Sequence, residues 1–174
     1  YAGFAQLGRT VGKLSASFGV RTDFTNLGGE LGDPMDQVSP RLSLSYAVSD
    51  AVNINANVGR FYQLPPYTVL GLRVGEELAN IDQGIGYIRA DHVVAGVEYF
   101  TTFSTKFSVE GFHKRYDRYP LLVAKGISLA NLGGDFGVVG NELAAPLSQG
   151  RSYGVEFLAQ QRLFKGFYGI VSYT

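Results

Sequence analysis

Apolar and polar residues alternate along most of this chain, and the pattern is clearest over residues 40–63. Two alternating segments there are joined by a short turn at residues 47–50, which contains serine and aspartate residues that bond readily to the local backbone. In the second segment the apolar positions are Val52, Ile54, Ala56 and Val58, and the polar positions are Asn53, Asn55 and Asn57. Because successive side chains of a strand point to opposite faces, the stretch predicts a hairpin with one apolar and one polar face.

The same period of two recurs before and after this hairpin. Strands are expected over residues 1–8 and 13–25, around 93–99 and 107–112, and over 152–160 and 167–174. With the hairpin they make about eight strands, with lengths near the ~9–11 residues that a tilted strand needs to cross a bilayer. The predicted fold class is therefore all-β: an antiparallel up-and-down meander that forms part of a transmembrane β-barrel.

The connections between the expected strands alternate in length. Those near residues 9–12, 47–50, 101–105 and 164–166 are short, and those at 26–38, 63–90 and 118–149 are long. We interpret the long ones as loops, with a short helix around residues 75–80. Strict alternation sends every long loop to one end of the sheet, which is typical of outer-membrane barrels. An aromatic girdle is expected beside the short turns. Its members are Tyr46, Tyr99, Phe100, Phe103, Phe107, Phe164 and Phe167.

Composition narrows the class further. The 174 residues contain no Cys, which excludes a disulfide framework and a thiolate metal site. Lys+Arg and Asp+Glu balance at 15 each, so we expect no nucleic-acid partner. No apolar run is long enough for a membrane-spanning helix. Because the first and last residues fall inside expected strands, we expect residues 1–174 to be part of a longer chain.

Three patterns that carry chemistry in other proteins are weak in this chain. Residues 150–154 fit the G-x-S-x-G turn of hydrolases, but no His or Asp follows the serine to complete a triad. Glycines are spaced like a phosphate loop over residues 134–140, but without a strand before them and a helix after. His92 and His113 fall on different strands, and neither has a second ligand at metal spacing. We therefore predict no catalytic residue, no metal ligand and no cofactor.

Four stretches of the chain resemble the barrel of TonB-dependent outer-membrane receptors, most closely those of Bacteroidetes-type bacteria. They are residues 39–71, 90–120, 126–142 and 150–174. The resemblance implies a barrel of about 22 strands that encloses a plug domain, with energy supplied by TonB. Compared with that family, the sequence shows no plug domain and no closing strand, so we expect residues 1–174 to be a partial barrel. The resemblance also implies import of a siderophore, vitamin, oligosaccharide or peptide across the outer membrane of a Gram-negative cell. The implied partners are outer-membrane lipid, the plug domain, the remaining barrel strands and, through the plug, the TonB complex.

In such a receptor the polar face would line a wet lumen, and the loops would carry the ligand contacts. The residues expected to face the lumen are Asn53, Asn55, Asn57, Glu98, Glu110 and Glu156. The ligand-contact candidates are aromatic and hydrogen-bonding residues of the two longest loops, suited to sugars, peptides or chelates. They are Tyr67, Arg73, Tyr87, Arg89, Arg118, Tyr119 and Asn131. Packing of one loop against the other accounts equally well for any single one of them.

Two other classes of protein stay open at this point. One is a soluble, lipocalin-like, eight-stranded barrel that turns its apolar face inward around a ligand. The other is a small outer-membrane enzyme, although the sequence offers no evident catalytic constellation for it. Alternation alone does not determine which face of the sheet lies inside.

Overall fold

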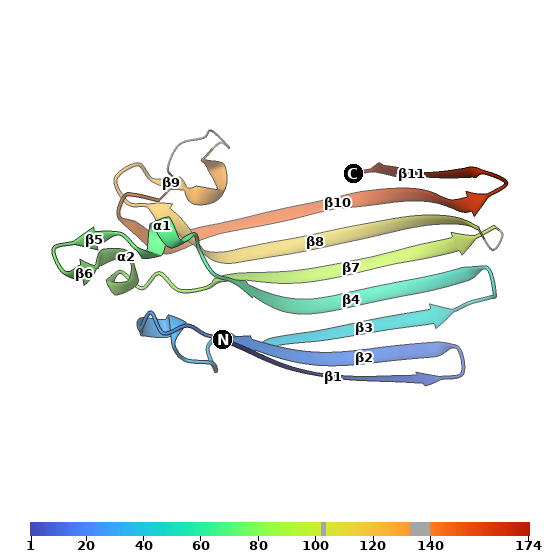
Figure 1. Ribbon diagram of the computed structural model, residues 1–174, viewed down its shortest axis with the longest axis horizontal. Coiled ribbons are helices and arrows are strands. Elements are labelled where there is room, and N and C mark those ends of the chain that lie inside the picture. The colour runs from blue at the N-terminus through green and yellow to red at the C-terminus, as the bar shows by residue number, and fades with distance from the viewer. Residues whose placement is uncertain (102–103, 133–139) are drawn as a thin grey trace.

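The computed structural model describes residues 1–101, 104–132 and 140–174, and its main element is one antiparallel sheet (Figure 1). Eight strands follow one another across this sheet in chain order, each paired with the next. They are β1 (Ala2–Val11), β2 (Leu14–Asp23), β3 (Ser39–Ala47), β4 (Val52–Gln63), β7 (Ile88–Phe100), β8 (Thr105–Leu122), β10 (Ala144–Phe164) and β11 (Phe167–Tyr173). The predicted all-β meander of about eight strands is confirmed.

Short elements occupy the long connections at one end of the sheet. They are the 3-10 turns η1 (Gly29–Leu31) and η2 (Leu129–Asn131), the helices α1 (Tyr67–Leu70) and α2 (Ala79–Asp82), and the strands β5 (Arg73–Val74), β6 (Glu77–Leu78) and β9 (Ile127–Ser128). Figure 1 shows the labelled short elements at the left end, while tight turns join the strands at the right end. The long connections therefore share one end, as predicted. Residues 102–103 of one short turn, and so Phe103, lie outside the described residues.

The predicted loop at residues 118–149 is wrong at both ends, because β8 continues to Leu122 and β10 begins at Ala144. Two bulges hide these strand ends from the sequence pattern. The pairing steps from Gly150 opposite Tyr116 to Ser148 opposite Tyr119, so β8 holds one extra residue there. A second step, between residues 145 and 148, adds one residue to β10. Each bulge shifts the alternation by one residue, so the period of two is lost although the strands continue.

The helix expected around residues 75–80 is also wrong in position. The β5–β6 hairpin occupies most of that stretch, with Arg73 opposite Leu78 and Val74 opposite Glu77. Gly75 has a φ of 66°, a conformation that glycine adopts without steric cost and that this tight turn requires. The helical turn α2 begins only at Ala79.

The strand register sorts the alternating residues into two faces. One row across the sheet reads Leu44, Ala56, Ala95, Gly111 and Val155. The next row, on the opposite side, reads Ser45, Asn55, Gly96, Glu110 and Glu156. We call the first side the apolar face and the second the polar face. All six residues expected to face a lumen belong to the polar face.

The apolar face is not covered by the rest of the chain. Phe18, Val58 and Val97 are 51%, 49% and 45% exposed, and the described parts of β1 and β11 each pair with one neighbour only, so the sheet is open. The buried apolar cluster lies among the long connections instead. It consists of Leu31, Val69, Leu70, Ile85, Tyr87, Leu122 and Ala144. No helix in the described ranges is long and apolar enough to cross a membrane.

Candidate functional site

The long connections are held together by Asn80, whose side chain is fully buried. Its Nδ2 donates to the carbonyl oxygen of Val69 at 2.7 Å and to that of Glu142 at 3.2 Å. Its Oδ1 accepts from the backbone N–H of Ala144 at 2.8 Å. One amide thus ties the connection between β4 and β7 to the start of β10. The loop end of the sheet is therefore a packed unit, which gives a site beside it a rigid support.

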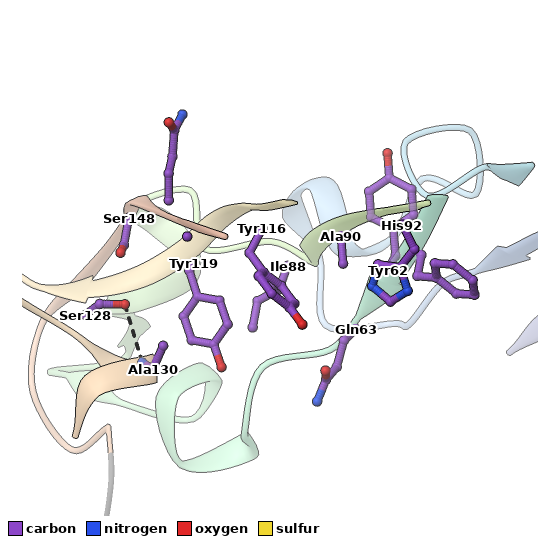
Figure 2. Close-up of a pocket in the computed structure, with 13 residues that line it drawn as sticks. Tyr62, Gln63, Ile88, Ala90, His92, Tyr116, Tyr119, Ser128, Ala130 and Ser148 are labelled. Atoms are coloured by element: carbon purple, nitrogen blue, oxygen red, sulfur yellow. Dashed lines mark hydrogen bonds between the residues drawn. The ribbon is translucent and has the colours of Figure 1, made fainter. Parts of the chain in front are cut away.

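A pocket of about 520 Å³ lies beside this unit on the polar face (Figure 2). Strands β4, β7, β8, β9 and β10 and the turn η2 contribute to it, and its walls are rich in aromatic rings with a few amides and hydroxyls between them. The lining residues are Phe61, Tyr62, Gln63, Ile88, Ala90, His92, Tyr116, Tyr119, Ser128, Ala130, Ser148, Gln149 and Gly150. Its size and its mixture of apolar walls and sparse polar groups are typical of small-molecule sites.

The bulge in β8 brings two tyrosines to the same side of the strand. Tyr116 follows the alternation of the polar face, opposite Ala90 and Gly150. Strict alternation would turn Tyr119 to the apolar face, but the extra residue at Arg118 restores it to the polar face. Arg118 has a φ of 60°, a conformation that is uncommon outside glycine. Figure 2 shows the Tyr119 and Tyr116 rings near each other, between the Ser128–Ala130 turn and His92.

A row of stacked groups continues the wall across the sheet. The guanidinium of Arg41 lies 4.4 Å from the centre of the Phe61 ring, and the Phe61 and His92 ring centres are 4.5 Å apart. The His92 ring meets Tyr116 edge-on at 6.4 Å. His92 Nε2 is buried without a hydrogen-bond partner, which is rare for a buried polar atom. The row presents ring faces for a flat or ring-shaped ligand to pack against, and one nitrogen that a ligand or water could satisfy.

Of the seven predicted ligand-contact residues, Tyr119 is the only one that lines this pocket. Tyr67, Arg73 and Asn131 are exposed on the loops. Tyr87 is 5% exposed within the buried cluster, and burial raises the pKa of its hydroxyl. Its position supports the loop-packing alternative for that residue.

The other two arginines among the candidates are engaged in ion pairs. Arg89 Nη2 lies 2.7 Å from Asp117 Oδ2, on the apolar face. Arg118 pairs with Glu30, a residue of η1, and its guanidinium fills the space beside Gly86. Arg118 therefore connects the bulge in β8 to the first long loop.

The residues expected to face a lumen lie together on the polar face, toward the short turns. Asn53 is opposite Glu98, and Lys106 Nζ forms an ion pair with Glu98. Asn55, Asn57 and Glu110 line a polar groove with serines of β2 and β3. Glu110 and Glu156 are direct cross-strand neighbours, so two like charges meet on this face.

Most of the pocket was missed from the sequence. Phe61, His92 and Tyr116 belong to strands, whereas the predicted contact residues lie in the expected loops. A usable signal was available, because three ring residues fall at polar-face positions where Asn, Ser or Gly occurs elsewhere on the same strands. The sequence pattern gives no sign that Tyr119 lies on the polar face, because its position there depends on the bulge in β8.

The weak chemical patterns take structural roles or lie outside the described residues. Residues 150–154 form part of β10 rather than a turn. His92 is on the polar face and His113 on the apolar face. No group of three or more His, Asp or Glu side chains in the described ranges could hold a metal ion. Of the spaced glycines, Gly134 and Gly137 lie outside the described residues.

Comparison with known proteins agrees with the architecture. The family of TonB dependent receptor-like β-barrels matches residues 1–174. Among solved structures, the chain is similar to the FrpB iron transporter from Neisseria meningitidis (F3-3 variant), with a TM-score of 0.58 and 12% sequence identity. That match covers 94% of this chain and 23% of the transporter chain, so this chain spans about a quarter of that protein's length. The search of curated proteins finds no similar sequence.

Proposed function

The chain belongs to the TonB-dependent receptor β-barrel family, and from this premise we propose that it forms eight wall strands of a receptor that imports a scarce nutrient. The transported compound would be a siderophore, vitamin, oligosaccharide or peptide. The receptor would sit in the outer membrane of a Gram-negative cell. Its plug domain would fill the lumen and transmit energy from TonB, as the family implies.

The observation that carries this proposal is the contrast between the two faces of one open sheet. The apolar face is exposed over the width of the sheet, from Leu7 in β1 to Val171 in β11. An exposed apolar surface of this extent is unusual in a soluble monomer and suits contact with lipid. The polar face, which carries the pocket and the Asn and Glu rows, would then face the lumen.

The pocket beside the loops is the proposed contact site for the transported compound. Tyr116, Tyr119 and His92 would stack against it, and Gln63 and Ser148 would offer hydrogen bonds. Support comes from the place of the pocket, since it lies at the loop end of the polar face, on the path from the cell exterior into a lumen.

The two alternative classes find less support. A lipocalin-like binder would bury its apolar face, and here that face is exposed and the sheet is open. For an enzyme, Ser152 would be the candidate nucleophile, but it lies within β10 opposite Lys114, without a His beside it in the register. Screening the full-length receptor on lipid and peptide substrates tests the enzyme class directly, and we expect no turnover.

The main test is uptake by cells that make the full-length receptor. Ferric chelates, cobalamin, oligosaccharides and peptides are offered to cells with and without the receptor gene, each with and without functional TonB. Saturable uptake of one compound class that needs both genes supports the proposal. Uptake that needs neither gene, across every class offered, contradicts it.

Variants of the pocket then test its role. Tyr116→Ala and Tyr119→Ala should each weaken binding of the imported compound, because each variant removes an aromatic ring against which the compound would pack. Such a contact is worth on the order of 1 kcal/mol. Tyr153→Ala is the matched control, since Tyr153 lies on the apolar face and is 71% exposed. Equal losses in all three variants would remove the pocket from ligand capture.

A further inference from the structure

Four arginines of the apolar face lie beyond its hydrophobic rows, toward the loop end. Two of them are neutralised: Arg60 Nε lies 2.7 Å from Asp91 Oδ1, and Arg89 Nη2 lies 2.7 Å from Asp117 Oδ2. The other two, Arg115 and Arg151, are direct cross-strand neighbours on β8 and β10. Four arginines against two aspartates leave an excess of two positive charges on this part of the apolar face.

Arg115 and Arg151 carry that excess. Both are exposed, and within the described ranges neither forms a hydrogen bond or an ion pair. Asp91 is the cross-strand neighbour of Arg115, but its carboxylate is already bonded to Arg60 and lies 3.5 Å from Arg89. Like charges directly opposite on a sheet are destabilising. An anion between the two guanidinium groups would remove this repulsion.

The surroundings of the two arginines form a shallow groove with polar walls. Its lining residues are His113, Arg115, Gln149, Gly150 and Arg151. Gln149 is fixed there, because its Nε2 donates to Asp117 Oδ1 at 3.2 Å. Two guanidinium groups can each bind a phosphate through paired N–H donors, and the imidazole adds a further donor. The groove therefore favours a phosphate rather than a single halide or a neutral group.

The position of the groove along the strands points to a lipid headgroup. Arg115 lies ten residues after the start of β8 at Thr105, and Arg151 lies thirteen residues before the end of β10 at Phe164. A tilted strand crosses the hydrocarbon core in about 9–11 residues. Counted from the short turns, both arginines thus lie at or just past the far boundary of the core. Val93, Tyr153 and Val155 lie next to them on the same face, where acyl chains would pack.

We propose that Arg115 and Arg151 bind the phosphate of a phosphorylated lipid headgroup in the outer leaflet. The proposal rests on the membrane orientation given under the proposed function, but it concerns the face opposite the ligand pocket. A transported anion would meet the polar face, so the lipid is the occupant that this placement favours.

The test measures lipid binding by the full-length receptor in nanodiscs of phosphatidylcholine. Lipid A with two phosphates is added, and its retention is measured by native mass spectrometry; the same lipid without phosphates is compared. Wild-type receptor should retain the phosphorylated lipid, and removal of the phosphates should abolish most of the retention. Arg115→Gln combined with Arg151→Gln should weaken retention roughly tenfold or more.

Lys114→Gln is the matched control, because Lys114 lies one residue from Arg115 but on the polar face, with its Nζ 4.8 Å from the Phe112 ring centre. It should retain the lipid as wild type does. The proposal is overturned by equal retention of both lipids in the wild type, by an unchanged double variant, or by an equal loss in Lys114→Gln.

Inorganic phosphate at the same concentration distinguishes a soluble anion from a lipid. Full displacement of lipid A by phosphate would overturn the lipid assignment, whereas little displacement supports it. If the double variant does not fold, the comparison of the two lipids on wild-type receptor still decides the question. Failure of nutrient uptake would leave these binding results unaffected, so the two proposals fail separately.

Discussion

The side chain of Glu110 lies across Gly96 of the neighbouring strand, leaving no room for a side chain there. A Cβ at residue 96 would come within 2.6 Å of the Glu110 Cγ and 2.7 Å of the carbonyl oxygen of Val109. The second contact is with backbone, so the strands themselves would have to move. On the polar face, Glu110 thus reaches toward Asn55 over a residue that must be small.

Gly96→Ala in the full-length receptor should therefore destabilise the barrel by about 1–3 kcal/mol, the usual cost of overpacking. The midpoint of denaturant unfolding in detergent measures the loss. Gly111→Ala is the control, since the nearest atom to a Cβ at residue 111 is 4.0 Å away. If both variants unfold at the same midpoint, the close approach at Gly96 is not a constraint.

Val58 and Asn57 are consecutive residues near the middle of β4, on the apolar and polar faces respectively. Val58→Lys should cost about 2–4 kcal/mol, because it places a charge against hydrocarbon at mid-membrane. Asn57→Lys should reduce the stability much less, since the ammonium group of a lumen-facing lysine stays hydrated. Folding into lipid vesicles at several urea concentrations compares the two. A larger loss for Asn57→Lys would reverse the assignment of lumen and lipid.

Asn80 is the residue whose loss should loosen the loops without affecting the sheet. Asn80→Asp keeps an acceptor for the Ala144 N–H but turns an oxygen toward the carbonyls of Val69 and Glu142. Each buried group left unsatisfied costs about 1–3 kcal/mol. Limited proteolysis of whole cells should cut residues 63–88 or 122–144 faster, with the barrel intact. The exposed Asn131→Asp should not change the cleavage rate.

Arg118 occupies a left-handed conformation, so its replacements should differ by backbone preference. Arg118→Gly and Arg118→Val both lose the ion pair with Glu30. Glycine adopts a φ of 60° freely, whereas a β-branched residue is strained there. We expect the valine variant to be less stable than the glycine variant by about 1 kcal/mol, after allowing for the freedom of glycine in the unfolded chain. Thermal unfolding of the two receptors in one detergent makes the comparison. Equal unfolding midpoints would mean that residue 118 does not have to adopt the left-handed conformation in the folded receptor.

Cysteine labelling of whole cells tests which end of the sheet faces the exterior. Thr68 and Asn131 are exposed at the loop end, and Ser49 is exposed in the turn between β3 and β4. The chain contains no cysteine of its own to interfere. Thr68→Cys and Asn131→Cys should react with a membrane-impermeant thiol reagent, whereas Ser49→Cys should react only in broken cells. The reverse pattern would invert the topology.

The sequence predicted the parts of the fold that depend on local alternation. The hairpin of β3 and β4 kept its period, so Leu44 and Asn55 could be assigned to opposite faces, and the short turns could be located. The prediction failed near Arg118 and residues 146–147, where single extra residues shift the period. It also failed at residues 75–80, where a helix was predicted. Gly75 adopts a positive φ there and allows a two-residue hairpin turn between β5 and β6.

The candidate site was harder to predict than the fold, for two physical reasons. Pockets form between side chains of different strands, and register brings His92 beside Phe61 although 31 positions separate them in the chain. Residues at the loop end such as Tyr87 and Arg118 have the chemistry of ligand contacts but are used to pack the loops. Sequence spacing does not distinguish these two uses of the same residue types.

The single-residue bulges in β8 and β10 are places where the chain can lose one residue without exchanging its apolar and polar faces. Removal of the extra residue at the bulge in β8 would leave two steps on β8 against two on β10 and would restore regular pairing there. Tyr119 would then follow Tyr116 by two positions and would keep its place on the polar face, and the eleven residues of β8 that precede Tyr116 would keep theirs. A lineage could therefore lose one codon at the bulge without exchanging the two faces of the strand, whereas the same loss in the regular part of β8 would exchange them up to the next bulge or loop.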